Sequence, residues 1–374
     1  MRALVTGQVG LDKKAFLEGV IALAAARYGR SARLANIGER MYAEAPDIPQ
    51  GRILDLPLSR LTALRRSVLK DVLGEASAGR DIIVNTHATF RWRHGLFFAF
   101  DYDQTQALAA DLYVTLVDNI DSVHARLLRD GHADHTLKDL MVWREEEVLA
   151  TELLSVLCRG HGHFYILARG QDGQTGSDAL VKLMFQPYLK KAYLSFPMSN
   201  ISDGAAQAAI LGFRSEMRRF FTCFDPGDLE EKYLGPLALA SAQAGNKFVT
   251  VTVAGRPLQI DTSELLSILP DIDGQIYARD FKLIDQADMI VSLIPELPDQ
   301  GGPNRPGISS GVERELQHAH EAGKDVFVIW QAGAPPSPFV TETATRVFAS
   351  LAEAIDYFLA NGYVPPAPSG MLFG

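Results

Sequence analysis

Two glutamates in the stretch PGISSGVEREL, residues 306–316, stand where a carboxylate could carry out chemistry. Glu313 and Glu315 follow Ser309 and Ser310 at the start of a run with helical spacing. One interpretation is structural: a serine caps the helix, and the glutamates favour its positive end. The other is chemical, because parallel α/β folds keep reactive groups beside the ends of their strands. A glutamate there can form a glycosyl intermediate through an oxocarbenium-like transition state.

The stretch TGQVGLDKK, residues 6–14, is a second candidate site, in this case for phosphate. It lies between a strand-like run and a helical pattern, as a phosphate loop of the form G-x-x-x-x-G-K-[ST] requires. Gly7 and Lys13 match that form, whereas Asp12 replaces its second glycine and Lys14 its Ser or Thr. An aspartate adds a like charge near a phosphate, and a lysine cannot hold magnesium. A plain strand-to-helix turn is the alternative interpretation.

The elements that must position these residues alternate along the whole chain. Predicted strands cover residues 2–6, 32–38, 81–87, 112–118, 163–169, 190–200, 247–253, 287–295 and 325–330. Predicted helices cover residues 15–28, 58–73, 204–221, 263–269, 277–286, 311–323 and 350–362. Strands that alternate with helices predict an α/β protein with two doubly wound parallel sheets. Residues 170–179 read as a loop or as the end of the first domain, and we place the domains at residues 1–186 and 187–374.

Composition excludes several classes of protein. The 374 residues suffice for two domains, and 47% hydrophobic and 22% charged residues are ordinary globular values. A net charge of −9 without a dense basic cluster argues against a nucleic-acid duplex as partner. Cys158 and Cys223 form no CxxC pair, which argues against disulfides and structural zinc. Without a signal-peptide pattern or a run of ~20 apolar residues, we expect a cytoplasmic protein that does not cross a membrane.

The first half of the chain resembles the archaeal-type adenylate kinase family over about residues 1–170. The segments that carry the resemblance are VTGQVGLDKKAF, NIGERM, LPLSRLTALRR and IIVNTHATFRW. It implies a kinase-like phosphate-loop domain that binds ATP or another nucleotide. The family has an aspartate where Asn85 stands, so with Lys14 both magnesium positions are altered, and we expect a pseudo-kinase without the metal-dependent reaction. The nucleotide-binding candidates are Gly7, Gly10, Lys13, Lys14, Arg91, Arg93, Arg126 and Arg129.

The second half resembles the nucleoside 2-deoxyribosyltransferase-like superfamily over about residues 190–360. KAYLSFPMSN, YARDFKLIDQADMIVSLIP and ISSGVERELQHAHEAGKDVFVIW follow the order of that group's motifs. The resemblance implies that Glu315 is the nucleophile and that Asp280 positions or protonates the leaving base. Phe196 stands where the first motif of the family has glycine, so we expect it to narrow or reshape the pocket. The resemblance also implies a homodimer or a higher homo-oligomer.

Serine in the last motif indicates the substrate. Transferases of free nucleosides carry an aspartate at the position of Ser309, whereas relatives that hydrolyse 5′-monophosphates carry serine. A carboxylate would repel a 5′-phosphate, while a hydroxyl and the amides of a helix N-terminus would hold it. The candidates for the phosphate and sugar site are Ser309, Ser310, Gly311, Ser195 and Ser199.

The sequence therefore predicts a nucleotide N-glycosidase that releases a free base and needs neither a metal nor a redox cofactor. Three alternatives stay open: a non-catalytic nucleotide sensor, an enzyme that cleaves the nicotinamide bond of NAD, and an active nucleoside monophosphate kinase. Lys14 and Asn85 disfavour the last of these. Retention of nucleotide binding in Glu315→Gln would favour the sensor, and loss of turnover the glycosidase.

Overall fold

A computed structural model describes residues 1–49, 51–92, 95–132, 134–170, 174–198, 201, 203–298 and 304–365. The chain divides into two compact units. Unit 1 comprises Met1–Phe185 and Asp228–Gly274, and unit 2 comprises Gln186–Gly227 and Gln275–Gly374. The boundary placed at residue 187 lies beside the first crossing between the units. The sequence did not predict that residues 228–274 return to unit 1.

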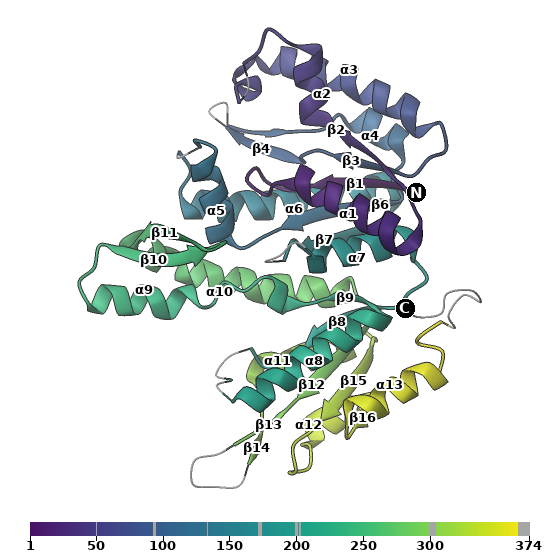
Figure 1. The fold of residues 1–374 in the computed structure, drawn as a ribbon, viewed down its shortest axis with the longest axis vertical. Helices are drawn as coiled ribbons and strands as arrows, with labels where there is room; N and C mark the ends of the chain where they lie inside the picture. Colours follow the sequence, from purple (N-terminus) through teal and green to yellow (C-terminus); the bar gives the residue numbers. More distant parts are fainter. Residues whose placement is uncertain are drawn as a thin grey trace. The chain divides into compact units, whose positions relative to one another are not determined.

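Unit 1 contains a five-stranded parallel sheet in the order β2-β3-β1-β6-β7 (Figure 1). Its strands are β1 (Arg2–Thr6), β2 (Arg33–Asn36), β3 (Ile82–Asn85), β6 (Leu112–Val117) and β7 (Phe164–Ala168). All residues of β3 and β6 are buried, as expected for parallel strands covered on both faces. The sequence predicted each of these five strands, and their parallel pairing confirms the α/β prediction for this half of the chain.

Helices cover both faces of this sheet. On one face α1 (Lys13–Tyr28) packs against α7 (Gln174–Phe185). The other face forms a core with α2 (Ile37–Glu44), α3 (Leu58–Ala76), α4 (Tyr102–Leu108) and α6 (Leu137–Arg159). The remaining elements of this part are η1 (Ile53–Asp55), α5 (Ile120–Arg129) and a hairpin of β4 (Thr89–Trp92) with β5 (Gly95–Phe98).

Helix α7 corrects the expectation of a loop over residues 170–179. The helix begins at Gln174, and Gly176 lies where a Cβ atom would come within 2.3 Å of the Ala168 carbonyl oxygen. The glycine therefore permits close approach of the helix to β7, rather than a turn. A polar, glycine-rich composition predicts a loop only where no such packing contact exists.

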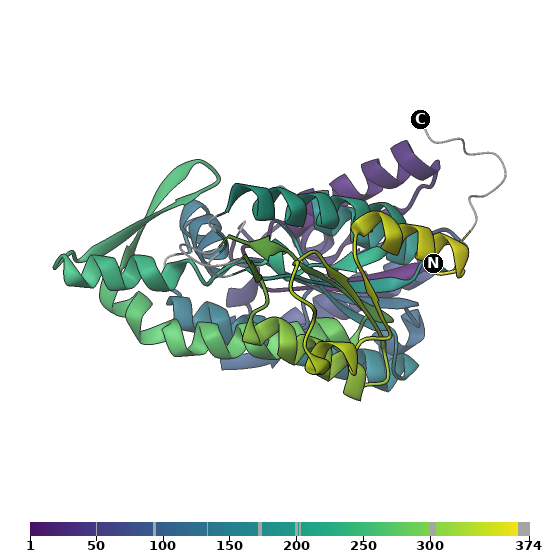
Figure 2. The same ribbon diagram turned by 90° about the horizontal axis from the view of Figure 1, so that it is seen from below.

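The returning segment, residues 228–274, begins at the last residue of η2 (Pro226–Asp228) and contains α9 (Leu234–Gln243), β10 (Phe248–Val253) and β11 (Arg256–Asp261). The predicted strand at residues 247–253 exists, but it pairs with β11 in an antiparallel hairpin and not in a parallel sheet. The hairpin packs beside α9 (Figure 1, Figure 2). The two helices predicted over residues 263–286 form one helix, α10 (Thr262–Asp285), which carries Pro270 inside it.

Unit 2 contains a second parallel sheet of five strands in the order β16-β15-β12-β8-β9. Its strands are β8 (Lys191–Ser195), β9 (Thr222–Phe224), β12 (Met289–Ile294), β15 (Asp325–Trp330) and β16 (Arg346–Phe348). Numbered along the chain, the order is 2-1-3-4-5, so the topology reverses between β8 and β12. Both sheets are therefore parallel, as the sequence predicted.

Different helices cover the two faces of this second sheet. One face forms an apolar core with α8 (Gly204–Phe220) and α13 (Leu351–Ala360). On the other face, α11 (Ser310–Glu321) packs on β12 and β15, and Phe281 of α10 stacks on His318 of α11. The short elements are β13 (Glu296–Leu297), β14 (Arg305–Pro306) and α12 (Pro338–Thr341). Within the described ranges, no helix of the chain is long and apolar enough to span a membrane.

Candidate functional site

The two neighbouring strands at the reversal point of unit 2, β8 and β12, lead to the candidate site. Side chains alternate along a strand, so Ala192 and Leu194 of β8 enter the core beside α8. Tyr193 and Ser195 therefore point to the opposite face, where they meet Glu315 of α11. In open α/β sheets, ligands bind beyond the carboxyl ends of the strands at such a reversal.

Both oxygens of the Glu315 carboxylate accept hydrogen bonds. The Tyr193 hydroxyl donates to Oε1 at 3.0 Å, and the Ser195 hydroxyl donates to Oε2 at 2.6 Å. The hydroxyl of Ser292, on β12, donates in turn to Ser195 Oγ at 3.3 Å. The carboxylate is thus held by two side chains of β8, one of which is in turn bonded to β12.

A second carboxylate, that of Asp280 on α10, acts on the same site. Burial raises the pKa of the Glu315 carboxyl to about 8; the hydrogen bond from Ser195 opposes this, and the charge of Asp280 adds to it. Burial also raises the pKa of Tyr193 well above its usual value, with further contributions from Glu315 and Asp280. Arg279 Nε lies 3.6 Å from Asp280 Oδ1 and supplies positive charge. Two carboxylates and one guanidinium therefore share the electrostatics of this site.

The structure brings together part of the predicted glycosidase site. Glu315 and Asp280 act on one another electrostatically, while Ser309 caps α11 by accepting a hydrogen bond from the Val312 amide at 3.3 Å. Ser310 is the first residue of α11, with Gly311 next, so all three lie at the helix N-terminus. Ser195 lies instead against Glu315 and is fully buried. Ser199 lies outside the described residues.

Three residues of this site were missed by sequence reasoning: Tyr193, Ser292 and Arg279. Tyr193 lies two positions before Ser195, so strand alternation alone places both on one face. Arg279 directly precedes Asp280. The ring of Phe196 packs in the core beside α8, 6.5 Å from the ring of Phe213.

The predicted phosphate loop of unit 1 has the backbone of a tight turn. Gly7 and Gly10 have φ values of +133° and +88°, and a Cβ atom at Gly7 would lie 2.5 Å from the Leu116 carbonyl oxygen. Asp12 adopts the left-handed conformation with φ of +50°, at the position where the phosphate-loop pattern has its second glycine. Two hydrogen bonds from Arg129, at 2.8 and 3.1 Å, hold its carboxylate.

The Lys and Arg side chains predicted to bind a nucleotide form hydrogen bonds and ion pairs within the protein. The Lys13 ammonium donates to the Gly7 carbonyl and lies 3.2 Å from His87 Nδ1, and burial lowers its pKa to about 7. Lys14 pairs with Glu39, Arg91 with Glu146, and Arg126 with Asp118. Arg93 lies outside the described residues. Within the described ranges, no cluster of three His, Cys, Asp or Glu side chains is arranged to hold a metal.

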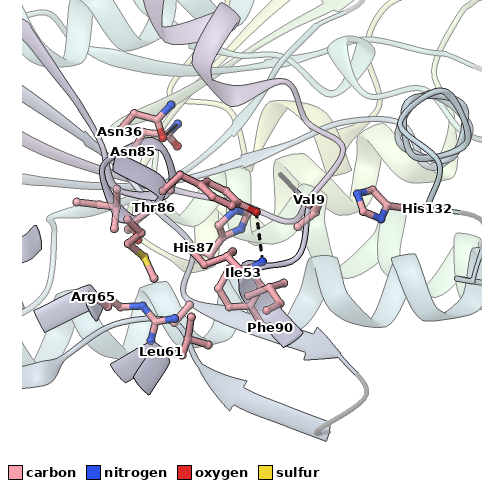
Figure 3. Close-up of a pocket in the computed structure, with 17 residues that line it drawn as sticks. Val9, Asn36, Ile53, Leu61, Arg65, Asn85, Thr86, His87, Phe90 and His132 are labelled. Carbon is pink, nitrogen blue, oxygen red and sulfur yellow. Dashed lines mark hydrogen bonds between the residues drawn. The ribbon is translucent and has the colours of Figure 1, made fainter. Parts of the chain in front are cut away.

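An apolar pocket lies beside this loop in unit 1 (Figure 3). Its polar lining includes Arg65, Asn85 and His87. Burial lowers the pKa of Arg65 to about 10, and its Nη2 atom has no hydrogen-bond partner among the described residues. Oδ1 of Asn85 likewise has no hydrogen-bond partner among the described residues. A donor and an acceptor at the wall of an apolar pocket are features of small-molecule sites.

Comparisons with known proteins identify no family. No protein-family model matches the sequence, and curated proteins gave no significant match. Among solved structures, the chain is similar to a β-glucosidase from Erythrobacter marinus, with 13% sequence identity and a TM-score of 0.22. The similarity covers 70% of this chain and 38% of that chain, so the chain spans well under half of that structure. A similarity this low supports neither a fold assignment nor a function.

Proposed function

We propose that the chain hydrolyses the N-glycosidic bond of a nucleoside 5′-phosphate and releases the free base, with Glu315 as nucleophile. The observation that carries the proposal is the Glu315 carboxylate, which accepts hydrogen bonds from Tyr193 and Ser195 at the reversal point of a parallel sheet. A carboxylate used only as a helix cap or surface charge does not need two buried donors. The nearby Asp280 supplies the second carboxyl group that glycosidic chemistry uses.

In the proposed reaction, the ionised Glu315 attacks the anomeric carbon while the bond from that carbon to the base breaks. The bonding electron pair moves to the base nitrogen, which takes a proton from Asp280. Water then attacks the glycosyl ester, gives one proton to Asp280 and restores the Glu315 carboxylate. Burial and the charge of Asp280 raise the pKa of Glu315 to about 8, so near neutral pH Glu315 carries a proton. Attack requires that proton on Asp280, and the donors Tyr193 and Ser195 favour that arrangement.

The N-terminus of α11 favours a phosphorylated substrate. Ser309, Ser310 and Gly311 lie there, and a Cβ atom at Gly311 would meet only Ser309 Oγ, at 3.6 Å. Exposed amides and hydroxyls at a helix N-terminus bind phosphate without a metal. A nucleoside 5′-phosphate would place its phosphate on these residues and its anomeric carbon toward Glu315.

Unit 1 is proposed to bind a nucleotide without transferring its phosphate. The turn geometry at Gly7 and Gly10 and the pocket lined by Arg65 and Asn85 support binding. Lys14 and Asn85 at the family's magnesium positions argue against phosphoryl transfer. A purely non-catalytic sensor is the alternative for the whole chain. Two further hypotheses remain: cleavage of NAD by the same carboxylate, and an active nucleoside monophosphate kinase.

Release of free base, followed by chromatography, tests the proposal. The protein is incubated with nucleoside monophosphates, nucleosides, triphosphates and NAD, each with and without ATP. We expect base from a monophosphate and a loss of at least about 10³-fold in Glu315→Gln. Glu313→Gln is the matched control, because Glu313 is exposed on the same helix. Absence of base from every substrate, or equal activity in Glu315→Gln, would reject the enzyme and leave the sensor.

A further inference from the structure

Two buried serines on adjacent strands are connected to Glu315. Ser195 and Ser292 are both fully buried, and β8 and β12 pair so that these two residues lie opposite one another. The Ser292 hydroxyl donates to Ser195 Oγ at 3.3 Å, and Ser195 donates to Glu315 Oε2 at 2.6 Å. The three groups therefore form a continuous series of hydrogen bonds that begins inside the sheet and ends on the carboxylate.

The direction of this series follows from the chemistry of a hydroxyl. Each serine has one hydrogen to donate, and its oxygen can accept as well. Because Ser195 accepts from Ser292, its own hydrogen is directed to Glu315, and hydrogen bonds in a series polarise one another. A bond from a neutral donor to a carboxylate favours the ionised form of the carboxylate.

We propose that Ser292 and Ser195 form a hydroxyl relay that positions the Glu315 carboxylate and favours its ionised form. Ser195 is then a positioning residue, acting on the reaction through Glu315, and Ser292 acts only through Ser195. The part of this inference that concerns catalysis rests on the proposed glycosidase function. The part that concerns the proton on Glu315 does not.

Other groups that face Glu315 act on the same proton. Tyr193, from β8, also donates to the carboxylate, and Asp280, from α10, opposes its ionisation. Arg279, beside Asp280, adds a positive charge that lowers the pKa of Tyr193. On α11 itself, His318 lies nearly one turn beyond Glu315 and pairs with Asp285. The serines differ from these residues because they carry no charge, so replacing them tests the hydrogen bonds alone.

Infrared titration of the full chain, with ¹³C-labelled glutamate, measures the proton on Glu315 directly. Glu315→Gln identifies its band. We expect Ser195→Ala to raise the titration midpoint by about one unit, the strength of a charge-assisted hydrogen bond. Ser292→Ala should raise it less, and the double variant should match Ser195→Ala, since Ser292 works through Ser195. Ser155→Ala, another fully buried serine but in α6 of unit 1, should change nothing.

Activity gives a second readout. In Ser195→Ala, base release at neutral pH should fall roughly tenfold while its alkaline limit moves upward with the midpoint. Ser195→Cys keeps the side-chain volume and a weak donor, so its rate of base release should lie between those of the unaltered chain and Ser195→Ala. This variant can be used for the test if Ser195→Ala disturbs folding. An unmoved midpoint in Ser195→Ala, or additive shifts in the double variant, would overturn the relay. A shifted midpoint without base release from any substrate would support the relay and reject the glycosidase.

Discussion

The pKa of Glu315 is set by effects that act in opposite directions. Burial has the largest effect and raises its pKa, and the charge of Asp280 adds to it. The hydrogen bonds from Ser195 and Tyr193 act against both. Paired carboxyl groups with displaced pKa values can divide acid and nucleophile roles between them, and their titration belongs to the pair.

The pH dependence expected for the proposed base release follows from the proton on Glu315. Glu315, whose pKa is raised to about 8, holds the proton that must pass to Asp280, and it loses this proton to solvent above that pH. We therefore expect kcat/KM to be flat near neutral pH and to fall above about pH 8, roughly tenfold per unit. Initial rates between pH 6 and 10 check the limit.

A variant at Asp280 tests the assignment of the two roles. In Asp280→Asn, a substrate with an activated leaving group no longer needs the acid, so only ionisation of Glu315 limits its reaction. Its rate should then rise with pH, the reverse of the profile of the unaltered chain. A fall above pH 8 in both proteins would show that Asp280 is not the acid.

Sequence patterns singled out the two carboxylates of this candidate site more readily than the residues around them. Glu315 and Asp280 stand in motifs, and their chemistry is visible in their residue types. Ser292 is the only polar residue of β12, and Tyr193 lies between Ala192 and Leu194 in β8. Which face of a sheet an isolated polar residue occupies depends on the register and on the helix above it, and a single sequence does not encode either directly.

At the scale of elements, a buried ion pair holds the returning segment of unit 1 to the rest of that unit. Arg144 of α6 donates to Glu231 at 2.7 and 3.2 Å, and both side chains are almost completely buried. Glu231 also accepts the amide of Ile120, the first residue of α5. Removal of one partner leaves a buried charge without compensation, which is far more costly than loss of a surface pair.

We expect Glu231→Ala to lower the free energy of unfolding of unit 1 by about 3–5 kcal/mol. Asp271→Ala is the matched control, since it breaks the exposed pair of Asp271 with Lys138 between the same two parts of the unit, and it should cost less than about 1 kcal/mol. Urea denaturation followed by circular dichroism measures both. Equal effects of the two variants would contradict the role given to Glu231.

The turn after β1 depends on glycine for steric reasons. A methyl group at Gly7 would meet the Leu116 carbonyl at 2.5 Å in a backbone conformation with φ of +133°. We expect Gly7→Ala to destabilise the chain by more than about 2 kcal/mol. In Gly19→Ala, inside α1 with open space around the new methyl group, stability should rise by roughly 0.5–1 kcal/mol. Thermal denaturation of the two variants compares them, and a tolerated Gly7→Ala would contradict this account.

Most strands of the parallel sheets could be predicted because hydrophobic runs are local, but the three-residue strands β9 and β16 and the long helix α6 were missed. The hairpin of β10 and β11 could not be placed, because its strand resembles any other apolar run and only its pairing partner distinguishes it. Helix α7 was hidden by a glycine whose function is close packing on β7. In both cases the deciding contact is with residues distant in the sequence.

At the scale of the whole molecule, unit 1 is made from two separated parts of the chain. A chain that ends at Phe185 lacks Glu231 and Tyr233, the partners of Arg144 and Asp121. A chain that ends at Gly274 keeps them.

We expect the chain that ends at Phe185 to be less stable by at least about 3 kcal/mol, or to fail to fold, because Arg144 loses its ion pair with Glu231. The chain that ends at Gly274 should keep the native far-ultraviolet dichroism of unit 1. Urea titration of the two truncated proteins compares them. Equal stability would show that residues 228–274 do not complete unit 1.

Because unit 1 is discontinuous in the sequence, its second part is synthesised only after the first part of unit 2. Synthesis passes through β8, α8 and β9, which belong to unit 2, before residue 231 exists to neutralise Arg144. The nascent chain therefore carries all five strands of the first sheet, but not residues 228–274, while the first elements of unit 2 are already synthesised. Domains usually fold in order during translation, and here that order is broken by the path of the chain itself. Slow codons between residues 186 and 230 would prolong this interval and raise the demand for chaperones.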